Sequence, residues 1–183
     1  PLGPEEIAAV REIYGWPHAA FEIPAAIKSD WQAIGARGSA ARAEWEARLA
    51  KLLPAKQDEF ARQIAGDAPR RLSATIRALK KQTSDSRPKV ATRKASEMAL
   101  EVINPIMPET LGGSADLTGS NLTNWSGSKA VRVDAWGNHI NYGVREFGMA
   151  AIMNGVALHG GFIPYGGTFL TFSDYSRNAI RMA

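Results

Sequence analysis

One carboxylate stands at the start of a largely apolar stretch, which makes it the strongest candidate in the chain for chemistry. This residue is Glu146, and the stretch Tyr142–Gly155 has the sequence Tyr-Gly-Val-Arg-Glu-Phe-Gly-Met-Ala-Ala-Ile-Met-Asn-Gly. Burying a charge costs free energy unless a partner compensates it. Because buried carboxylates are over-represented at functional sites, the partner of Glu146 decides what the chain does.

Small and hydroxyl-bearing residues fill the loop Gly113–Asn121, which contains Asp116 and Ser120. Its backbone amides and hydroxyls could hold an anionic or polar ligand. The alternative, which spacing alone favours, is a turn and helix start capped by Asp116 or Ser120. Arg93 lies near another expected helix start, where a cation opposes the helix dipole. This position hints at an anion partner, although a solvated arginine is the commoner arrangement.

Three aromatic residues, Phe169, Phe172 and Tyr175, follow the pair Gly166-Gly167 at intervals of three. In a helix they would form one stripe. Such a stripe usually packs into a core, and the alternative is a stacking wall for a flat heteroaromatic ring. The two glycines would let a ligand approach closely.

Several kinds of catalytic and metal site lack their signatures. The chain has no cysteine, which excludes disulfides, thiolate metal sites and a cysteine nucleophile and fits a reducing, cytoplasmic compartment. Its three histidines show no metal-ligand spacing, so no metal site is predicted from its residues. Neither a Walker-type phosphate loop nor a Gly-x-Ser-x-Gly elbow is present.

Membrane and nucleic-acid partners are not expected either. No stretch reaches the ~18 consecutive apolar residues of a membrane helix. The first residues are polar and acidic, unlike a signal peptide. The net charge is +4, and its positive excess lies before residue 91, on expected solvated helices without interleaved aromatic residues.

The 183 residues suffice for one domain, or for one domain with a helical extension. In residues 1–90, proline-initiated helices are expected from Pro4 and Pro24, with a further helix from Ser39 to a break at Pro54. The polar segment Thr83–Pro88 is predicted to be a linker. We expect this half to be a helical spacer without chemistry.

Residues 91–183 alternate between helical and strand patterns, which predicts an α/β fold with a mostly parallel sheet. The expected helix Glu146–Leu158 is apolar on nearly all sides and should therefore be buried. Ligands in such sheets bind at the carboxyl ends of strands, where two loops, Gly112–Asn121 and Gly166–Thr171, are expected. The expected strands are Pro108–Ser114, His139–Gly143 and Phe162–Tyr165, and the expected helices are Thr92–Val102, Glu146–Leu158 and Phe172–Met182.

Taken together and in this order, these pieces resemble bacterial-type transketolases over essentially the whole chain. The resemblance implies that residues 1–90 are the helical tail of the diphosphate-binding domain and the interdomain linker. Residues 91–183 would be the first part of the pyrimidine-binding domain. The segments similar to the family's motifs, at the family's spacings, are Ala91–Lys94, Gly112–Thr118 with Ser120-Asn121, Tyr142–Glu146, Met153–Gly155 and Tyr165–Phe169, with Gly15-Trp16-Pro17 in the linking stretch.

Transketolases use thiamin diphosphate and a divalent cation to move a two-carbon ketol unit from a ketose phosphate to an aldose phosphate. The resemblance implies that Glu146 is catalytic and binds nitrogen N1′ of the cofactor's aminopyrimidine ring. A carboxyl group in an apolar pocket can share a proton with a ring nitrogen. The resemblance further implies that Phe169, Phe172 and Tyr175 pack around that ring.

The remaining implied roles belong to the loop and to the start of a helix. Asp116 and Leu117 match residues beside the cofactor, whereas Arg93 and Ser120 match positions that hold the substrate's phosphate. The family's cofactor lies between two subunits, so the resemblance implies a homodimer acting on sugar phosphates.

Two departures from the family pattern stand out. Phe147 occupies a position where the family often has histidine, and we expect the change to be tolerated. The Gly-Asp-Gly…Asn motif is absent, so the cation, Mg²⁺ or Ca²⁺, is expected to be bound by residues outside this chain. We therefore expect the 183-residue segment alone to be inactive, and stable only in association with further segments or chains.

Two other functions remain open at this point. One is a related thiamin-diphosphate enzyme such as deoxyxylulose phosphate synthase, although the Gly112–Thr118 motif and the pair Arg93 and Ser120 favour a transketolase. The other is a non-catalytic association module with the same fold. Glu146 and the aromatic stripe argue against the module, because a protein that only associates has no need of a buried carboxylate.

Overall fold

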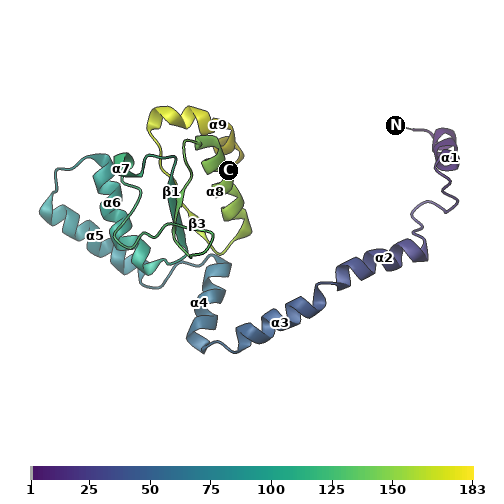
Figure 1. Ribbon diagram of the computed structural model, residues 1–183, viewed down its shortest axis with the longest axis horizontal. Coiled ribbons are helices and arrows are strands. Elements are labelled where there is room, and N and C mark those ends of the chain that lie inside the picture. Colours follow the sequence, from purple (N-terminus) through teal and green to yellow (C-terminus); the bar gives the residue numbers. More distant parts are fainter. Residues whose placement is uncertain (1) are drawn as a thin grey trace. The chain divides into compact units, whose positions relative to one another are not determined.

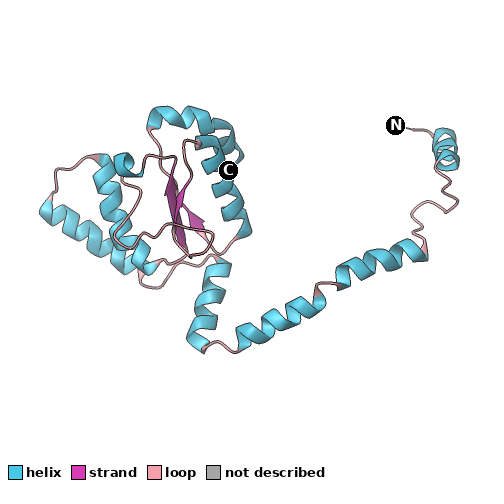
Figure 2. Cartoon of the chain, in the orientation of Figure 1, coloured by secondary structure: helices cyan, strands magenta, loops and turns pink. Residues whose placement is uncertain are grey.

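The computed structural model describes residues 2–183, which divide into two compact units at Leu52 and Leu53. The described part of the first unit consists of helices joined by loops (Figure 2). Proline stands at the first position of α1 and just before α2, and none of the three helices contains a buried residue. They are α1 (Pro4–Ile13), α2 (Ala25–Ala36) and α3 (Ser39–Ala50).

The second unit mixes helices with short strands. The helix from Ser39 ends at Ala50, which confirms the predicted break before Pro54, and Pro54 begins a new helix, α4. The helices are α4 (Pro54–Ala65), α5 (Leu72–Ser86), α6 (Thr92–Ile103), α7 (Thr118–Asn121), α8 (Glu146–His159) and α9 (Ser173–Met182), with 3₁₀ turns η1 (Asn104–Ile106) and η2 (Leu170–Phe172). The strands are β1 (Thr110–Ser114), β2 (His139–Asn141) and β3 (Ile163–Pro164).

The three strands form a parallel sheet in the order β2-β1-β3, which confirms the predicted α/β class. Gly112 is paired with His139, and Thr110 with Ile163. Helices α5 and α6 lie on one side of this sheet, and α8 and α9 lie on the other (Figure 1). Because β1 is central, the loop after it lies beside the loop after β3 at the carboxyl end of the sheet.

Two glycines in β1 allow aromatic rings to pack directly on the strand backbone. A Cβ atom on Gly112 would lie 2.2 Å from the ring of Tyr165. A Cβ atom on Gly113 would lie 2.4 Å from the ring of Tyr142 and 2.5 Å from the carbonyl oxygen of Ile140. The small buried core consists of Ala115, Tyr142 and Met149. The partly buried Ile140 and Met153 pack against it.

A buried ion pair joins α4 to the beginning of β1. Arg62 donates from Nη1 and Nη2 to the two oxygens of Glu109, at 2.9 and 3.0 Å. It also donates to Glu59, and its hydrogen bonds to the carboxylates of Glu59 and Glu109 raise the pKa of its guanidinium. The backbone of Glu109 accepts a hydrogen bond from the Ile163 amide at 2.9 Å, so the pair is anchored in the sheet.

Helix α8 forms as predicted, but the expectation that nearly all its sides are buried is wrong. Only Glu146 and Met149 are buried along it, whereas Phe147 and Ile152 are about half exposed and Leu158 is 89% exposed. Within the described chain α8 packs mainly against α9 and β3, and Met149 and Met153 join the core with Ala115 and Tyr142, while Phe147, Ile152 and Leu158 leave apolar surface exposed.

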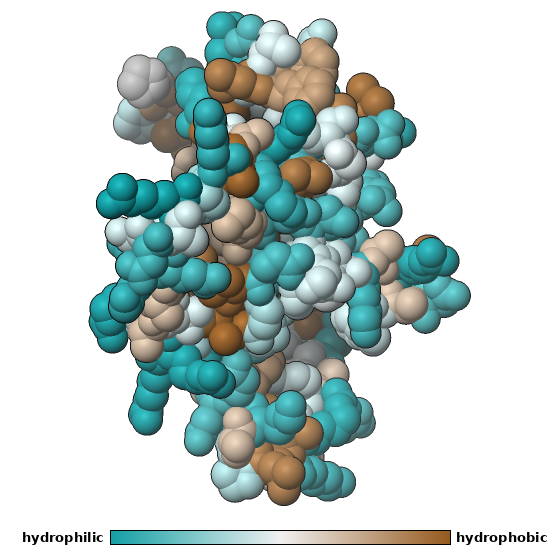
Figure 3. Space-filling model, turned by 90° about the vertical axis from the view of Figure 1, so that its left-hand side faces the viewer, coloured by the Kyte–Doolittle hydropathy of each residue, from teal (hydrophilic) through white to brown (hydrophobic). Residues whose placement is uncertain are grey.

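The predicted linker Thr83–Pro88 is also largely wrong, because α5 continues through Ser86. Leu72, Ile76 and Leu79 are partly buried at helical spacing, and this amphipathic pattern extends the helix into the polar segment. The surface seen from the α5 side carries mainly hydrophilic side chains (Figure 3). Among the described residues, no helix combines the length and apolar character needed to cross a bilayer.

Candidate functional site

Glu146 is the first residue of α8 and is 6% exposed. Thr168, in the loop after β3, donates a hydrogen bond from Oγ1 to Glu146 Oε1 at 3.1 Å. The positive end of the helix dipole also favours an anion at this position. The neighbouring Arg145 does not pair with the carboxylate, since its Nη1 donates to the carbonyl oxygen of Tyr142 at 3.1 Å. Glu146 is thus a buried carboxylate held mainly by one hydroxyl.

The three aromatic side chains form a continuous row, although they do not share one helix. Phe169 and Phe172 stack with ring centroids 5.6 Å apart, and Phe172 and Tyr175 are tilted at 6.0 Å. Phe169 is extended before η2, and Tyr175 lies on α9. Tyr175 is 68% exposed and Phe169 is 40% exposed, so simple core packing does not explain the row.

An apolar pocket of about 610 Å³ lies between the carboxylate and two members of this row, Phe172 and Tyr175, whereas Phe169 lines a second pocket. In the described chain no hydrogen bond reaches the second oxygen of Glu146, Oε2. One carboxylate oxygen beside exposed aromatic rings suits a flat heteroaromatic ring that carries a basic nitrogen. The residues that line the pocket are Val144, Arg145, Glu146, Phe147, Gly148, Phe172 and Tyr175.

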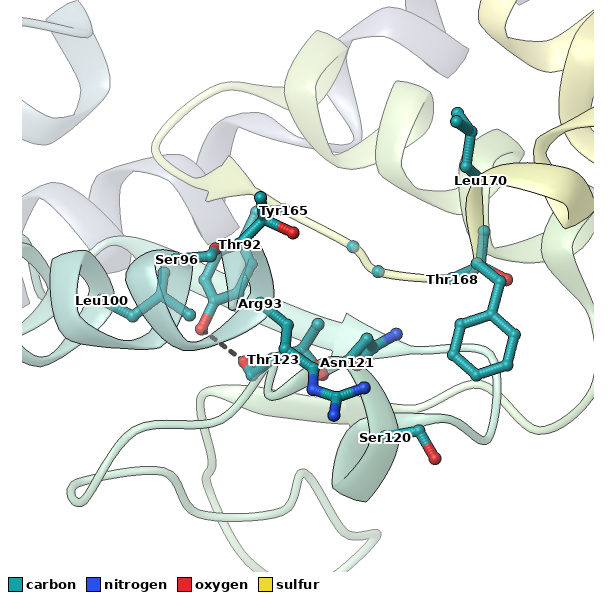
Figure 4. Close-up of a pocket in the computed structure, with 13 residues that line it drawn as sticks. Thr92, Arg93, Ser96, Leu100, Ser120, Asn121, Thr123, Tyr165, Thr168 and Leu170 are labelled. Carbon is teal, nitrogen blue, oxygen red and sulfur yellow. Dashed lines mark hydrogen bonds between the residues drawn. The ribbon is translucent and has the colours of Figure 1, made fainter. Parts of the chain in front are cut away.

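A second pocket, of about 550 Å³, lies between the starts of α6 and α7 and the loop after β3 (Figure 4). Arg93 comes from α6 and Ser120 from α7, and the fold brings both to this pocket. The guanidinium of Arg93 extends toward α7 (Figure 4), and no ion-pair partner is found for it among residues 2–183. A cation beside hydroxyl groups suits an anionic ligand. Thr92, Ser96 and Thr168 also line the pocket.

The loop between β1 and α7 folds differently from the predicted cap. Ser114, not Asp116 or Ser120, accepts a hydrogen bond from the loop, from the amide of Leu117 at 3.1 Å. The residue preceding α7 is Leu117 and its side chain makes no cap, so capping by Asp116 or Ser120 is wrong. Asp116 is exposed, with φ at +64°, and it lines neither pocket. The role expected for Asp116 and Leu117 beside the cofactor stays a prediction.

Sequence reasoning missed two residues that organise the site. Ser114 is 1% exposed, and its hydroxyl donates to the carbonyl oxygen of Gly167 at 2.9 Å while accepting from Asn121 Nδ2 at 3.1 Å. Thr168 lines the pocket that contains Arg93 and Ser120, and its hydroxyl also donates a hydrogen bond to Glu146. The signal for Thr168 was a single hydroxyl directly after two glycines in a loop already selected as a ligand loop.

The residues in the apolar pocket fit the pyrimidine ring of thiamin diphosphate. Glu146 Oε2 would face a ring nitrogen, and Phe172 and Tyr175 would offer ring faces to the pyrimidine. A metal site is a different matter: among the described residues no group of three His, Asp or Glu side chains is placed to hold a metal ion.

Comparisons with known proteins agree with the resemblance. A family model described as "Transketolase, pyrimidine binding domain" matches residues 88–183, and one described as "Transketolase, thiamine diphosphate binding domain" matches residues 1–69. A transketolase of Rhodobacter capsulatus is 56% identical over 184 residues, which cover all of this chain and 27% of that protein. Transketolase 1 of Escherichia coli K12 is 51% identical, with all of this chain and 28% of that protein covered.

Solved structures give the same result. The transketolase of Pichia stipitis in complex with sedoheptulose 7-phosphate superposes with a TM-score of 0.80 at 34% identity, covering all of this chain and 28% of that one. The transketolase of Leishmania mexicana superposes with a TM-score of 0.81 at 35% identity, covering 27% of that chain. The chain therefore spans little more than a quarter of the length of these relatives.

Proposed function

The chain belongs to the transketolase family, and from this membership we propose that it is the part of a ketol-transferring enzyme that binds the pyrimidine ring of thiamin diphosphate. The enzyme would move a two-carbon unit from a ketose phosphate to an aldose phosphate, as a step of the pentose phosphate pathway. The observation that carries the proposal is the buried Glu146, with one oxygen held by Thr168 and the other beside an aromatic-lined pocket.

Glu146 is the catalytic residue of this proposal. Thiamin diphosphate supplies, when bound, a carbon nucleophile that carries the two-carbon unit. Glu146 Oε2 holds the proton shared with ring nitrogen N1′, and the apolar pocket excludes water that would compete for it. Phe169, Phe172 and Tyr175 provide the ring faces that orient the pyrimidine.

Arg93 and Ser120 would bind the phosphate group of the sugar substrate. Their shared pocket supports this assignment, as does the guanidinium of Arg93, which has no ion-pair partner within residues 2–183. The Pichia stipitis relative is described as a complex with sedoheptulose 7-phosphate, a substrate of the same chemical class. Asp116 and Leu117 would lie beside the cofactor on the exposed side of the loop.

The proposed enzyme is a cytoplasmic homodimer with the cofactor between subunits. The exposed apolar side chains of α8, among them Phe147 and Leu158, support the presence of a covering surface that the described chain does not itself provide. A divalent cation, Mg²⁺ or Ca²⁺, would be bound by residues outside this chain. For that reason the isolated segment is expected to be inactive.

Replacement of one carboxylate tests the proposal. Glu146→Gln, made in the full-length protein that contains this chain, should lower kcat for ketol transfer by roughly 10³-fold or more, because an amide cannot exchange a proton with the ring nitrogen. The measurement is turnover with a ketose phosphate donor and an aldose phosphate acceptor, at saturating thiamin diphosphate and Mg²⁺.

Glu44→Gln serves as the matched control, since Glu44 lies exposed on α3 and should leave turnover unchanged. Circular dichroism checks that both variants keep the fold. Near-normal turnover of Glu146→Gln would make the carboxylate structural and would overturn the proposed role of every residue around it. Turnover of the unaltered protein only with pyruvate as donor would instead indicate a synthase.

A further inference from the structure

The carboxylate of Glu146 depends on a hydroxyl that comes from another part of the fold. Thr168 Oγ1 donates to Oε1 at 3.1 Å. Among residues 2–183 no second side chain makes a hydrogen bond or ion pair with this carboxylate. A hydrogen bond to a buried charged group is worth more than a neutral one, and it also fixes the rotation of the acceptor.

The backbone on the N-terminal side of Thr168 is clamped to the end of β1. The amide of Gly167 donates to the carbonyl oxygen of Gly113 at 3.1 Å. The carbonyl oxygen of Gly167 accepts from the hydroxyl of Ser114 at 2.9 Å and from the amide of Ala115 at 3.3 Å. Because Gly167 makes three hydrogen bonds, the backbone position from which the Thr168 side chain extends is fixed.

Gly166 lets the same loop lie close to α8. A Cβ atom at this position would stand 2.6 Å from Met153 Sδ and 3.0 Å from Met149 Sδ. The missing side chain therefore sets how near the loop comes to the helix that begins at Glu146. This approach brings the hydroxyl of Thr168 to the first turn of α8.

We propose that Thr168 is a positioning residue for Glu146, holding Oε1 so that Oε2 is presented to the ring nitrogen in the apolar pocket. The inference rests on the proposed function, since it takes thiamin diphosphate as the ligand of that pocket. Thr168 also lines the pocket that contains Arg93 and Ser120. It thus stands between the expected phosphate-binding residues and the catalytic carboxylate.

A hydroxyl that orients Oε2 affects only ligands that have a basic nitrogen at position 1′. Comparing ligands with and without this nitrogen therefore distinguishes a hydroxyl that positions Glu146 from one that only shapes the pocket. The test compares two ligands in isothermal titration calorimetry with the full-length protein and Mg²⁺: thiamin diphosphate, and an analogue in which a C–H group replaces ring nitrogen N1′. The variants are Thr168→Val, which keeps the shape, and Thr168→Ser, which keeps the hydroxyl.

Thr168→Val should weaken the binding of thiamin diphosphate by about tenfold, because the carboxylate loses its charge-assisted hydrogen bond and its fixed orientation. Binding of the analogue should change by less than about twofold, since it makes no bond to Oε2. Thr168→Ser should restore thiamin diphosphate binding to within about threefold of the unaltered protein. Thr171→Val, at an exposed threonine of η2, is the matched control and should change neither affinity.

An equal loss of affinity for both ligands in Thr168→Val would mean that the hydroxyl only shapes the pocket, and the inference would fail. Unchanged affinity for thiamin diphosphate would overturn it as well. Thr168→Ala, which removes the hydroxyl without a replacement methyl group, must show the same selectivity. If the unaltered protein bound no thiamin diphosphate, the proposed function itself would fall, and this inference would fall with it.

Discussion

The two units contain similar helices but differ in what they bury. In the first unit α1, α2 and α3 have no buried residue, and Trp31 stays largely exposed on α2. In the second unit polar side chains such as Ser114, Glu109 and Glu146 are buried on partners from distant parts of the sequence. Local periodicity builds helices in both units, whereas the candidate site lies where the chain makes non-local polar contacts.

Two arginine–glutamate pairs show this difference at nearly the same shortest N–O distance. Arg42 and Glu46 lie one helical turn apart on α3, at 2.8 Å, with side chains 80% and 52% exposed. Arg62 and Glu109 meet at 2.9 Å, with side chains 15% and 3% exposed. Water screens the exposed pair more strongly than the buried one. Breaking the two pairs should therefore change stability by different amounts, although their distances are nearly equal.

Breaking the two pairs should give the largest contrast in stability between the units. Arg62→Met leaves the carboxylate of Glu109 buried without its partner, which should lower local stability by about 3 kcal/mol. Native-state hydrogen exchange at the amide of Ile163 measures this, because that amide donates to the Glu109 backbone. Arg42→Met in α3 should produce no measurable change in the exchange of its neighbours.

A double variant guards this interpretation. Arg62→Met combined with Glu109→Leu removes both charges and should recover much of the lost protection, because no unpaired charge remains. Equal, small effects of Arg62→Met and Arg42→Met would contradict the comparison, since burial would then add nothing to the pair.

Glycines in the two units should respond to substitution with opposite signs. Gly113→Ala places a methyl group against the Tyr142 ring and a backbone carbonyl oxygen, and should lower stability by about 1–3 kcal/mol. For Gly35, in α2, an added Cβ atom would have no described residue within 4 Å apart from its chain neighbours and the adjacent helix backbone. Gly35→Ala should therefore stabilise its helix by about 0.5–1 kcal/mol.

Native-state hydrogen exchange again measures the change in stability caused by each substitution. The reporters are the amide of Gly167, which donates to Gly113, and the amides of α2. A stabilising Gly113→Ala would mean that the strand tolerates a side chain, contrary to the packing of Tyr142. A strongly destabilising Gly35→Ala would reveal a close neighbour outside the described chain.

The sequence predicted what depends on local pattern. The helix starts near Pro4 and Pro24, the break at Pro54 and the parallel sheet follow from periodicity and proline positions. The extent of α5 was underestimated, because the polar residues of Thr83–Ser86 suggested a linker while an amphipathic pattern upstream extended the helix.

The candidate site was predicted in its residues but not in its contacts. Glu146, Phe172 and Tyr175 line one pocket, and Arg93, Ser120 and Phe169 line another. Their roles in catalysis and binding stay predictions. The bond from Thr168 to Glu146 and the pair of Arg62 with Glu109 were missed, because each joins residues far apart in sequence and neither leaves a periodic trace.

A buried histidine gives the smallest and most specific contrast. His139, on β2, is 5% exposed, and its Nε2 lies 3.2 Å from Thr118 Oγ1. Its Nδ1 is buried without a hydrogen-bond partner in the described chain. Burial lowers the pKa of this imidazole from its ordinary value of 6.5, because the charged form loses its hydration.

The lowered pKa predicts a loss of stability on the acid side. The unfolded chain takes up a proton near pH 6.5 while the folded chain still excludes it, so the unfolded state binds more protons and stability falls as the pH drops below that value. Urea unfolding of the full-length protein at about pH 8 and about pH 5.5 should show this loss, and His139→Gln should reduce it. His18→Gln in the first unit is the matched substitution and should leave the loss unchanged. If the His139→Gln variant kept the whole acid-side loss of stability, a group other than His139 would cause that loss. Burial of His139 on β2 would then not distinguish the pH dependence of the two units.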